Sequence, residues 1–186
     1  LIDNGVDYMV VMGTTGESAT LSVNEQQLII NYVKKIINNR VPIVIGVGGN
    51  NTAEVVDRLG SIDFSGIEAI LSVSPYYNKP SQKGLLYHYA RISEASPVDI
   101  ILYNVPSRTS LNIETKTVVM LAEKYANIIG IKEASGDIAQ CMDLISSCPN
   151  DFMIISGDDK MTFPIMSLGG VGVISVQAMV MPTIFT

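Results

Sequence analysis

The stretch "IIGIKEASGD" (residues 128–137) is an apolar run that leads into Lys132 and a polar turn. Short uninterrupted apolar runs are typical of strands in a parallel sheet that is covered on both faces. The run therefore predicts a buried strand over 128–132. Lysine is rarely buried, because removing an ammonium from water without a partner is costly. Lys132 then has two interpretations: it extends to solvent from the strand end, or its pocket keeps the amine neutral so that it can attack a carbonyl.

The same pattern recurs along the chain, where short β-branched runs alternate with amphipathic stretches. The predicted strands cover residues 8–12, 42–47, 69–73, 100–103, 128–132, 152–156 and 173–176. One intervening helix begins at a capping box, Ser22 to Glu25. Six apolar residues are expected on one face of that helix, namely Leu28, Ile29, Tyr32, Val33, Ile36 and Ile37. Ser81 and Asn112 are predicted to cap two further helices.

Seven strands, each followed by a helix, fit either an open doubly wound sheet or a closed (β/α)₈ barrel. The open sheet usually carries a G-x-G-x-x-G loop, and neither "GVGGNN" (46–51) nor "LGGVGV" (168–173) has that spacing. A barrel needs eight strands and typically about 250 residues. We therefore expect an α/β fold, a (β/α)₈ TIM barrel present as a fragment that lacks the first strand and the C-terminal helices. The single domain would cover 1–186, beginning in the first helix and ending just after the eighth strand.

Composition narrows the class of protein. The 186 residues are 47% hydrophobic and carry a net charge of -6, which argues against nucleic acid or an anionic membrane surface as a partner. Cys141 and Cys148 have neither disulfide-scaffold density nor metal-ligand spacing, which indicates reduced thiols in a cytoplasmic protein. No apolar run reaches transmembrane length, and no signal peptide is visible.

Polar residues follow the predicted strands at their carboxyl ends, where a (β/α)₈ barrel builds its active site. The segments are "GTTGES" (13–18), "SPYYNKP" (74–80), "YNVPSRT" (103–109), Lys132, "SGDD" (156–159) and "GVISV" (172–176). Hydroxyls, an arginine and a lysine should therefore converge on one pocket, without the histidine or cysteine cluster that would indicate a metal. Each of these residues, taken singly, could serve only the structure, for example in a tight turn or a packed loop. Glu133, Asp158 and Asp159 are expected to be solvated or helix-capping acids.

Six segments, in order, resemble one family. "GTTGES", "PYYNKPSQKGLLYHY", "YNVPSRT", "GIKEASGD", "ISGDD" and "GVISV" are similar to the dihydrodipicolinate synthases, pyruvate-dependent Schiff-base aldolases related to N-acetylneuraminate lyase. The resemblance spans essentially the whole chain. It implies a lyase that condenses pyruvate with L-aspartate 4-semialdehyde in the diaminopimelate branch of lysine biosynthesis. It also implies no metal or nucleotide cofactor, because the covalent imine supplies the chemistry.

The resemblance assigns roles to the catalytic residues. Lys132 would form the imine, and Tyr103 would donate and accept protons. Thr14 would link Tyr103 to Tyr77, which in this family reaches in from the neighbouring subunit. A homotetramer, built as a dimer of dimers, is therefore expected.

The substrate carboxylates would have their own partners. By the same resemblance, Thr15 would bind the carboxylate of pyruvate, with backbone groups of Ile174 and Gly157 nearby. Arg108 offers a planar cation suited to the carboxylate of the semialdehyde. Two alternatives remain open. A sister aldolase such as N-acetylneuraminate lyase would share the lysine and tyrosine but lack this arginine, and a non-catalytic ligand-binding barrel would keep only the fold.

Bacterial members that respond to lysine hold it near the loop after "GTTGE". The residues at matching positions here are Ser18, Ala19, Asn50, Glu54 and Tyr76. The chain departs from sensitive relatives at Val23 and Gln26, where those relatives can carry histidines. Losing hydrogen bonds to a charged ligand weakens binding, so we expect feedback inhibition by lysine to be weak or absent.

Overall fold

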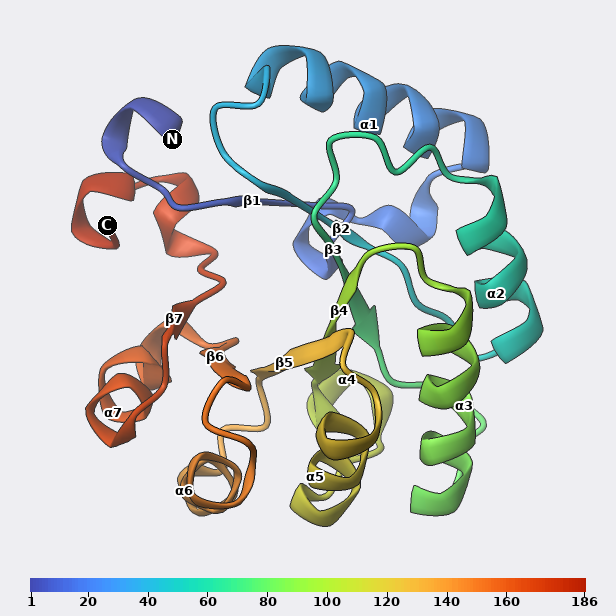
Figure 1. Cartoon of the computed structure of the whole chain (residues 1–186). Helices are drawn as coiled ribbons and strands as arrows, with labels where there is room; N and C mark the ends of the chain where they lie inside the picture. The colour runs from blue at the N-terminus through green and yellow to red at the C-terminus, as the bar shows by residue number, and fades with distance from the viewer.

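The computed structural model describes residues 1–186 and consists of seven strands with helices between them (Figure 1). The strands are β1 (Met9–Val11), β2 (Ile43–Gly46), β3 (Ala69–Val73), β4 (Asp99–Asn104), β5 (Ile128–Glu133), β6 (Met153–Ser156) and β7 (Gly172–Val173). The helices are α1 (Val23–Ile37), α2 (Thr52–Ser61), α3 (Gln82–Ala95), α4 (Pro106–Thr109), α5 (Thr115–Lys124), α6 (Ile138–Ser147) and α7 (Thr162–Leu168). Short 3₁₀ turns cover Ile2–Asn4, Thr14–Gly16, Ser18–Thr20, Asp159–Met161, Gln177–Met179 and Pro182–Ile184.

The strands form one parallel sheet whose spatial order is the order of the chain, from β1 to β7. Figure 1 shows the sheet curled inward with the helices around its outside. A doubly wound sheet would reverse its strand order at a switch point and carry helices on both faces. The architecture is therefore a partial TIM barrel, as the sequence predicts, with β1 and β7 at its two edges.

Two apolar layers explain why the strands are apolar without alternation. The larger layer, of 26 buried residues, lies between the sheet and the helices and includes Ile45, Ile70 and Leu121. The smaller layer fills the concave side of the sheet with Val44, Ala69, Leu71, Ile101, Tyr103, Val105 and Ile155. Both faces of strands β1 to β6 are thus covered. None of the helices combines the length and the apolar character needed to cross a membrane.

Helix α1 begins where the sequence predicts, but its six apolar residues do not form one buried face. Ser22 N donates to Glu25 Oε2 at 2.8 Å, and Glu25 N donates back to Ser22 Oγ at 3.3 Å, which completes the capping box. Ile37 is buried, whereas Leu28 and Tyr32 are 69% and 66% exposed. At about 100° per residue, the six predicted positions spread over roughly 180° of the helix. The sheet covers only part of that arc, so a second apolar stripe faces outward.

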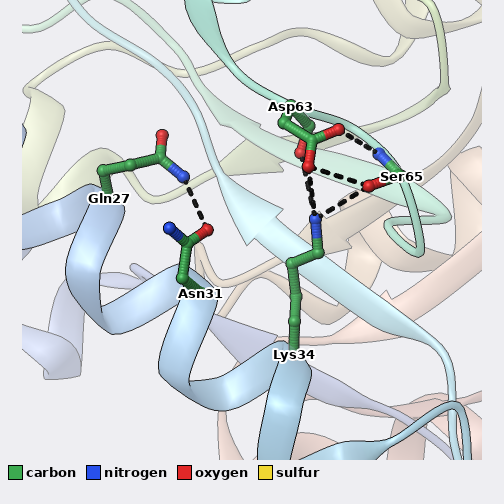
Figure 2. A network of polar contacts seen from close by, with 5 residues as sticks. All are labelled: Gln27, Asn31, Lys34, Asp63 and Ser65. Atoms are coloured by element: carbon green, nitrogen blue, oxygen red, sulfur yellow. Dashed lines mark hydrogen bonds and ion pairs between the residues drawn. The ribbon is translucent and has the colours of Figure 1, made fainter.

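A polar network joins the last turns of α1 to the loop that precedes β3 (Figure 2). Lys34 Nζ lies 3.0 Å from Asp63 Oδ2 and 3.1 Å from Ser65 Oγ. The bond from the Ser65 backbone N–H, and then the bond from Lys34, lower the pKa of Asp63 to about 2. Gln27 and Asn31 are paired at 2.9 Å on the same helix. Because this loop enters the amino end of β3, the network lies at the end of the sheet opposite the polar loops that follow the strands.

Two predicted details are wrong. The seventh strand covers only Gly172–Val173, since the backbone N–H of Val176 donates to Asp159 Oδ2 at 3.2 Å rather than to a strand. Helix α5 begins at Thr115 with Glu114 at the N-cap position, and Asn112 does not cap it. Asn112 belongs instead to a polar network behind β4 and β5, described below.

Close contact between β1 and β2 yields a stability prediction. A Cβ at Gly46 would lie 2.7 Å from the carbonyl carbon of Met12, which is backbone and cannot move aside cheaply. Gly46→Ala should therefore lower the free energy of unfolding by roughly 2 kcal/mol or more, measured as a lower Tm. Gly60→Ala is the matched control, because Gly60 lies in α2 and nothing stands within 4 Å of the place that its new methyl group would occupy. That change should stabilise by about 0.5–1 kcal/mol; equal tolerance of both substitutions would contradict the packing.

Candidate active site

The register of β4 and β5 places two predicted catalytic residues side by side. Tyr103 pairs with Lys132 in these parallel strands. The pairing contains an irregularity, because Ile100 pairs with Ile128 whereas Ile101 pairs with Gly130. Ile129 is therefore an extra residue in β5, a β-bulge of the kind that redirects the side chains beyond it.

The bulge decides which face of the sheet Lys132 occupies. Ile128 packs in the layer between sheet and helices, whereas Ile129 packs on the concave side with Tyr103. Under strict alternation, Lys132 would share the face of Ile128 and point toward the helices. The extra residue reverses this, so Lys132 lies on the concave face. Gly130 permits the local geometry, because a Cβ there would lie 2.7 Å from the carbonyl oxygen of Met153 on β6.

Lys132 is the only buried lysine of the chain, at 8% exposure. Its Nζ lies 4.4 Å from the centre of the Tyr103 ring, within the range of a cation–π contact. No carboxylate lies within 4.0 Å of the amine, which forms no salt bridge. Burial lowers the pKa of Lys132 to about 8, with Asp159 acting against the shift and Arg108 adding to it. The solvent-extending interpretation of this lysine is therefore wrong.

Glu133, the next residue, points the opposite way into a polar network. Its carboxylate accepts hydrogen bonds from Asn104 Nδ2 at 2.9 Å, Gln140 Nε2 at 2.9 Å and Ser135 N at 2.6 Å. Asn112 Oδ1 also accepts from Asn104 at 2.7 Å. Glu133 is 2% exposed, so the prediction of a solvated or capping acid is wrong. The network ties α6 and the loop before α5 to the ends of β4 and β5.

A cavity of about 370 Å³ opens at the carboxyl ends of β1 to β4. Three of the predicted catalytic and substrate-binding residues line it, namely Thr14, Tyr103 and Arg108. Ser18, Ala19 and Tyr76, which match effector positions, line the same cavity. The structure thus brings together the loops after β1, β3 and β4, as the barrel rule predicts, whereas Lys132 of β5 is not among the residues that line this cavity.

Other predicted residues lie outside this cavity. Thr15 is exposed, and Tyr77 is 89% exposed with a left-handed φ of 70°. Asn50 and Glu54 are engaged elsewhere: the Asn50 carbonyl accepts from Asn78 at 3.1 Å, and Glu54 accepts from Asn51 at 2.9 Å. Within one chain, therefore, no relay from Thr14 to Tyr77 is assembled.

The backbone N–H groups of Ile174 and Gly157, predicted to lie near the carboxylate of pyruvate, already form hydrogen bonds within the chain. The N–H of Ile174 donates to Ser156 O at 2.9 Å, and that of Gly157 donates to Glu133 O at 2.7 Å. Neither N–H is free to bind an anion in this structure. A Cβ at Gly157 would lie 3.0 Å from Lys132 Cε. The absence of a side chain at Gly157 therefore leaves room for the lysine.

The cavity also contains residues that the sequence did not single out. Arg58, on α2, lines it and donates to Gln26 Oε1. Gln26 in turn donates to the carbonyl of Ser18 at 2.9 Å, which fixes its amide. Burial lowers the pKa of Arg58. In the sequence, the spacing of Glu54 and Arg58 resembles an ordinary surface pair at i and i+4, so nothing separated this arginine from a solvated one.

Asp159 also differs from expectation. Its Oδ2 accepts from the backbone N–H groups of Val176 and Gln177 at 3.2 and 3.1 Å. Asp159 therefore binds the start of the distant 3₁₀ turn Gln177–Met179 rather than capping its own turn, whereas Asp158 caps the turn Asp159–Met161 by accepting from Lys160 N at 3.0 Å. No three side chains of His, Cys, Asp and Glu gather in a way that could hold a metal ion.

Known proteins provide an independent comparison. The chain is 55% identical over 176 residues to the 4-hydroxy-tetrahydrodipicolinate synthase of Flavobacterium psychrophilum, covering 95% of this chain and 60% of that relative. It superposes on the chloride-inhibited dihydrodipicolinate synthase of Acinetobacter baumannii complexed with pyruvate, with a TM-score of 0.94, 41% identity and coverage of 99% and 63% of the two chains. It also superposes on the dihydrodipicolinate synthase of Cyanidioschyzon merolae with lysine bound. The TM-score is 0.91 at 40% identity, and the match covers 95% of this chain and 60% of that chain.

The chain thus spans about 60% of the length of these relatives. The profile of the Dihydrodipicolinate synthetase family matches residues 1–186. With a match over every residue and a relative at 55% identity, the chain belongs to the dihydrodipicolinate synthetase family.

Proposed function

We propose that the protein is a 4-hydroxy-tetrahydrodipicolinate synthase, a lyase that condenses pyruvate with L-aspartate 4-semialdehyde through an imine on Lys132. The observation that carries this proposal is the single buried lysine, turned onto the concave face beside Tyr103. The relative from Flavobacterium psychrophilum bears this name, and the structure from Acinetobacter baumannii contains pyruvate.

The lowered pKa of Lys132 suits imine formation, because only the neutral amine attacks a ketone. With a pKa of about 8, about a quarter of the amine is neutral at pH 7.5, against roughly one part in a thousand for an ordinary lysine. The amine adds to the ketone of pyruvate, and the ketone oxygen leaves as water. The resulting iminium draws electrons from the methyl group, so a proton leaves and an enamine forms. The enamine carbon then attacks the aldehyde, and cyclisation releases the product from Lys132.

Tyr103 is the proposed proton donor and acceptor, because its ring lies against the amine and it lines the cavity. Thr14, on the same cavity, would pass protons between Tyr103 and Tyr77. The exposure of Tyr77 at 89% supports its insertion into a neighbouring subunit, because a tyrosine ring usually packs against apolar surface. We therefore infer a homotetramer, and we place the enzyme in the cytoplasm with no metal or nucleotide cofactor.

Carboxylate recognition completes the proposal. Thr15, in the 3₁₀ turn after β1, would hold the carboxylate of pyruvate. Arg108 lies in α4, immediately after β4, and lines the cavity. Its exposed guanidinium is free of salt bridges within the chain and would bind the carboxylate of the semialdehyde. This assignment favours the semialdehyde over a sugar acceptor, which needs hydroxyl partners.

The imine assignment is tested by trapping. Borohydride added to the intact protein with pyruvate should reduce the imine and leave one pyruvyl group on the peptide that contains "GIKEASGD". Lys132→Ala should abolish the adduct, whereas Lys160→Ala, which removes an exposed lysine, should retain it. Mass spectrometry locates the label, and its appearance on Lys79, Lys83 or Lys160 would refute the assignment.

Arg108 has a separate test. Arg108→Ala should reduce kcat/KM for the semialdehyde about ten- to a hundredfold, because a charge-assisted contact is worth about 1.5–3 kcal/mol. Pyruvate trapping should change much less. Arg91→Ala is the control, since Arg91 forms only an exposed pair with Glu94. Equal damage to both half-reactions would mean that Arg108 supports the structure rather than the substrate.

We further propose that lysine is a poor inhibitor of this enzyme, although the relative from Cyanidioschyzon merolae binds it. Arg58 places a cation in the cavity lined by Ser18, Ala19 and Tyr76, where it repels the ammonium groups of lysine. Gln26 is already occupied by Arg58 and by the Ser18 carbonyl.

Initial rates measured against lysine concentration, with both substrates near their KM values, check this proposal. We expect no half-inhibition at submillimolar lysine. Arg58→Leu removes the repelling charge and should increase sensitivity, whereas strong inhibition of the unaltered enzyme would contradict the proposal.

A further inference from the structure

Asp159 links the loop after β6 to the loop after β7. It begins the 3₁₀ turn Asp159–Met161, and its Oδ2 accepts from the N–H groups of Val176 and Gln177. Both donors lie just beyond β7, in a segment that has no ladder partner. One carboxylate oxygen therefore anchors the backbone that follows the last strand of the sheet.

The other oxygen of Asp159 has no such partner. Oδ1 is buried and accepts no hydrogen bond within the chain. A buried acceptor without a donor costs free energy, and such groups in native proteins usually have a functional reason. The strand and loop that carry Asp159 lie against Lys132: Ile155 pairs with Lys132, and a Cβ at Gly157 would lie 3.0 Å from Lys132 Cε. At this position the charge of Asp159 favours the cationic form of Lys132, whereas Arg108 disfavours it. Asp159 is thus an anion two residues beyond Gly157, which itself lies against the Lys132 side chain.

We propose that Asp159 is a positioning residue for the imine chemistry, in which Oδ2 fixes the loop after β7 and the carboxylate charge stabilises the cation on Lys132. The inference rests on the proposed function. During the reaction, the amine nitrogen bonds to the ketone carbon, the ketone oxygen departs as water, and the nitrogen keeps a positive charge as the iminium. A fixed negative charge stabilises that cation without a salt bridge that would hold the free amine protonated at every pH.

Charge and anchoring can be separated by substitution. Asp159→Asn keeps an oxygen that can accept from Val176 and Gln177 but removes the charge. Asp158→Asn is the matched control, because Asp158 only caps the turn through Lys160 N. The readout is the pH dependence of borohydride trapping of pyruvate on Lys132, with Tm measured for each variant.

The unaltered protein should trap pyruvate with a midpoint near pH 8. Asp159→Asn should shift the midpoint downward by about half a pH unit or more, because a nearby anion no longer favours the ammonium. It should also weaken pyruvate binding several-fold at pH 9, where the iminium has lost its counter-charge. Asp158→Asn should match the unaltered protein.

An unchanged midpoint in a folded Asp159→Asn protein would overturn the proposal and leave Asp159 as an anchor alone. If that variant does not fold, Asp159→Glu and Asp159→Gln replace it as a pair of equal shape; only the neutral member should shift the midpoint, and identical profiles would refute the charge effect. Failure of the unaltered protein to trap pyruvate at any pH would instead refute the proposed function.

Discussion

One extra residue in β5 decides which side chains at the end of this strand face the concave side of the sheet. The bulge at Ile129 places Lys132 on the concave face beside Tyr103, and by the same step it sends Glu133 outward toward the helices. Parallel pairing then gives two adjacent pairs on opposite faces, Tyr103 with Lys132 inside and Asn104 with Glu133 outside. The inner pair places the buried amine 4.4 Å from the centre of the tyrosine ring. The outer pair holds the two strand ends in place.

Burying the amine has a cost that the surrounding fold must offset. The pKa of Lys132 falls from 10.5 to about 8, which corresponds to roughly 3 kcal/mol. Because the folded pKa is the lower one, this penalty applies fully below pH 8 and disappears as the pH rises toward 10.5. The offset comes from apolar packing and from the amide network around Glu133. The larger neutral fraction of the Lys132 amine at neutral pH is thus accompanied by a loss of stability.

The sequence predicted those features that depend on local pattern. Apolar runs gave the strands, the Ser22–Glu25 spacing gave a helix start, and parallel topology gave the convergence of Thr14, Tyr103 and Arg108. It did not reveal the bulge, because an extra residue in an apolar run leaves no change in composition.

The differences around the site concern acids, amides and an arginine whose partners lie far away in the sequence. Asp159 accepts hydrogen bonds from residues 17 and 18 positions away. Glu133 accepts from Asn104 on β4, and Arg58 donates to Gln26 on α1. Asn112 likewise appeared to be a cap, yet it bonds to Asn104 and Gln140. Polar side chains of this kind look solvated until the tertiary structure supplies their partners. Local pattern therefore predicts the burial of apolar runs but not the burial of single polar side chains.

The orientation of Lys132 is tested most directly by a crystal structure of the intact protein after pyruvate and borohydride treatment. We predict continuous electron density from Lys132 Nζ on the concave side of the sheet, beside the Tyr103 ring. We also predict that Ile129 is the unpaired residue of β5. A regular β4–β5 ladder with Lys132 directed toward the helices, or an adduct on another lysine, would contradict it.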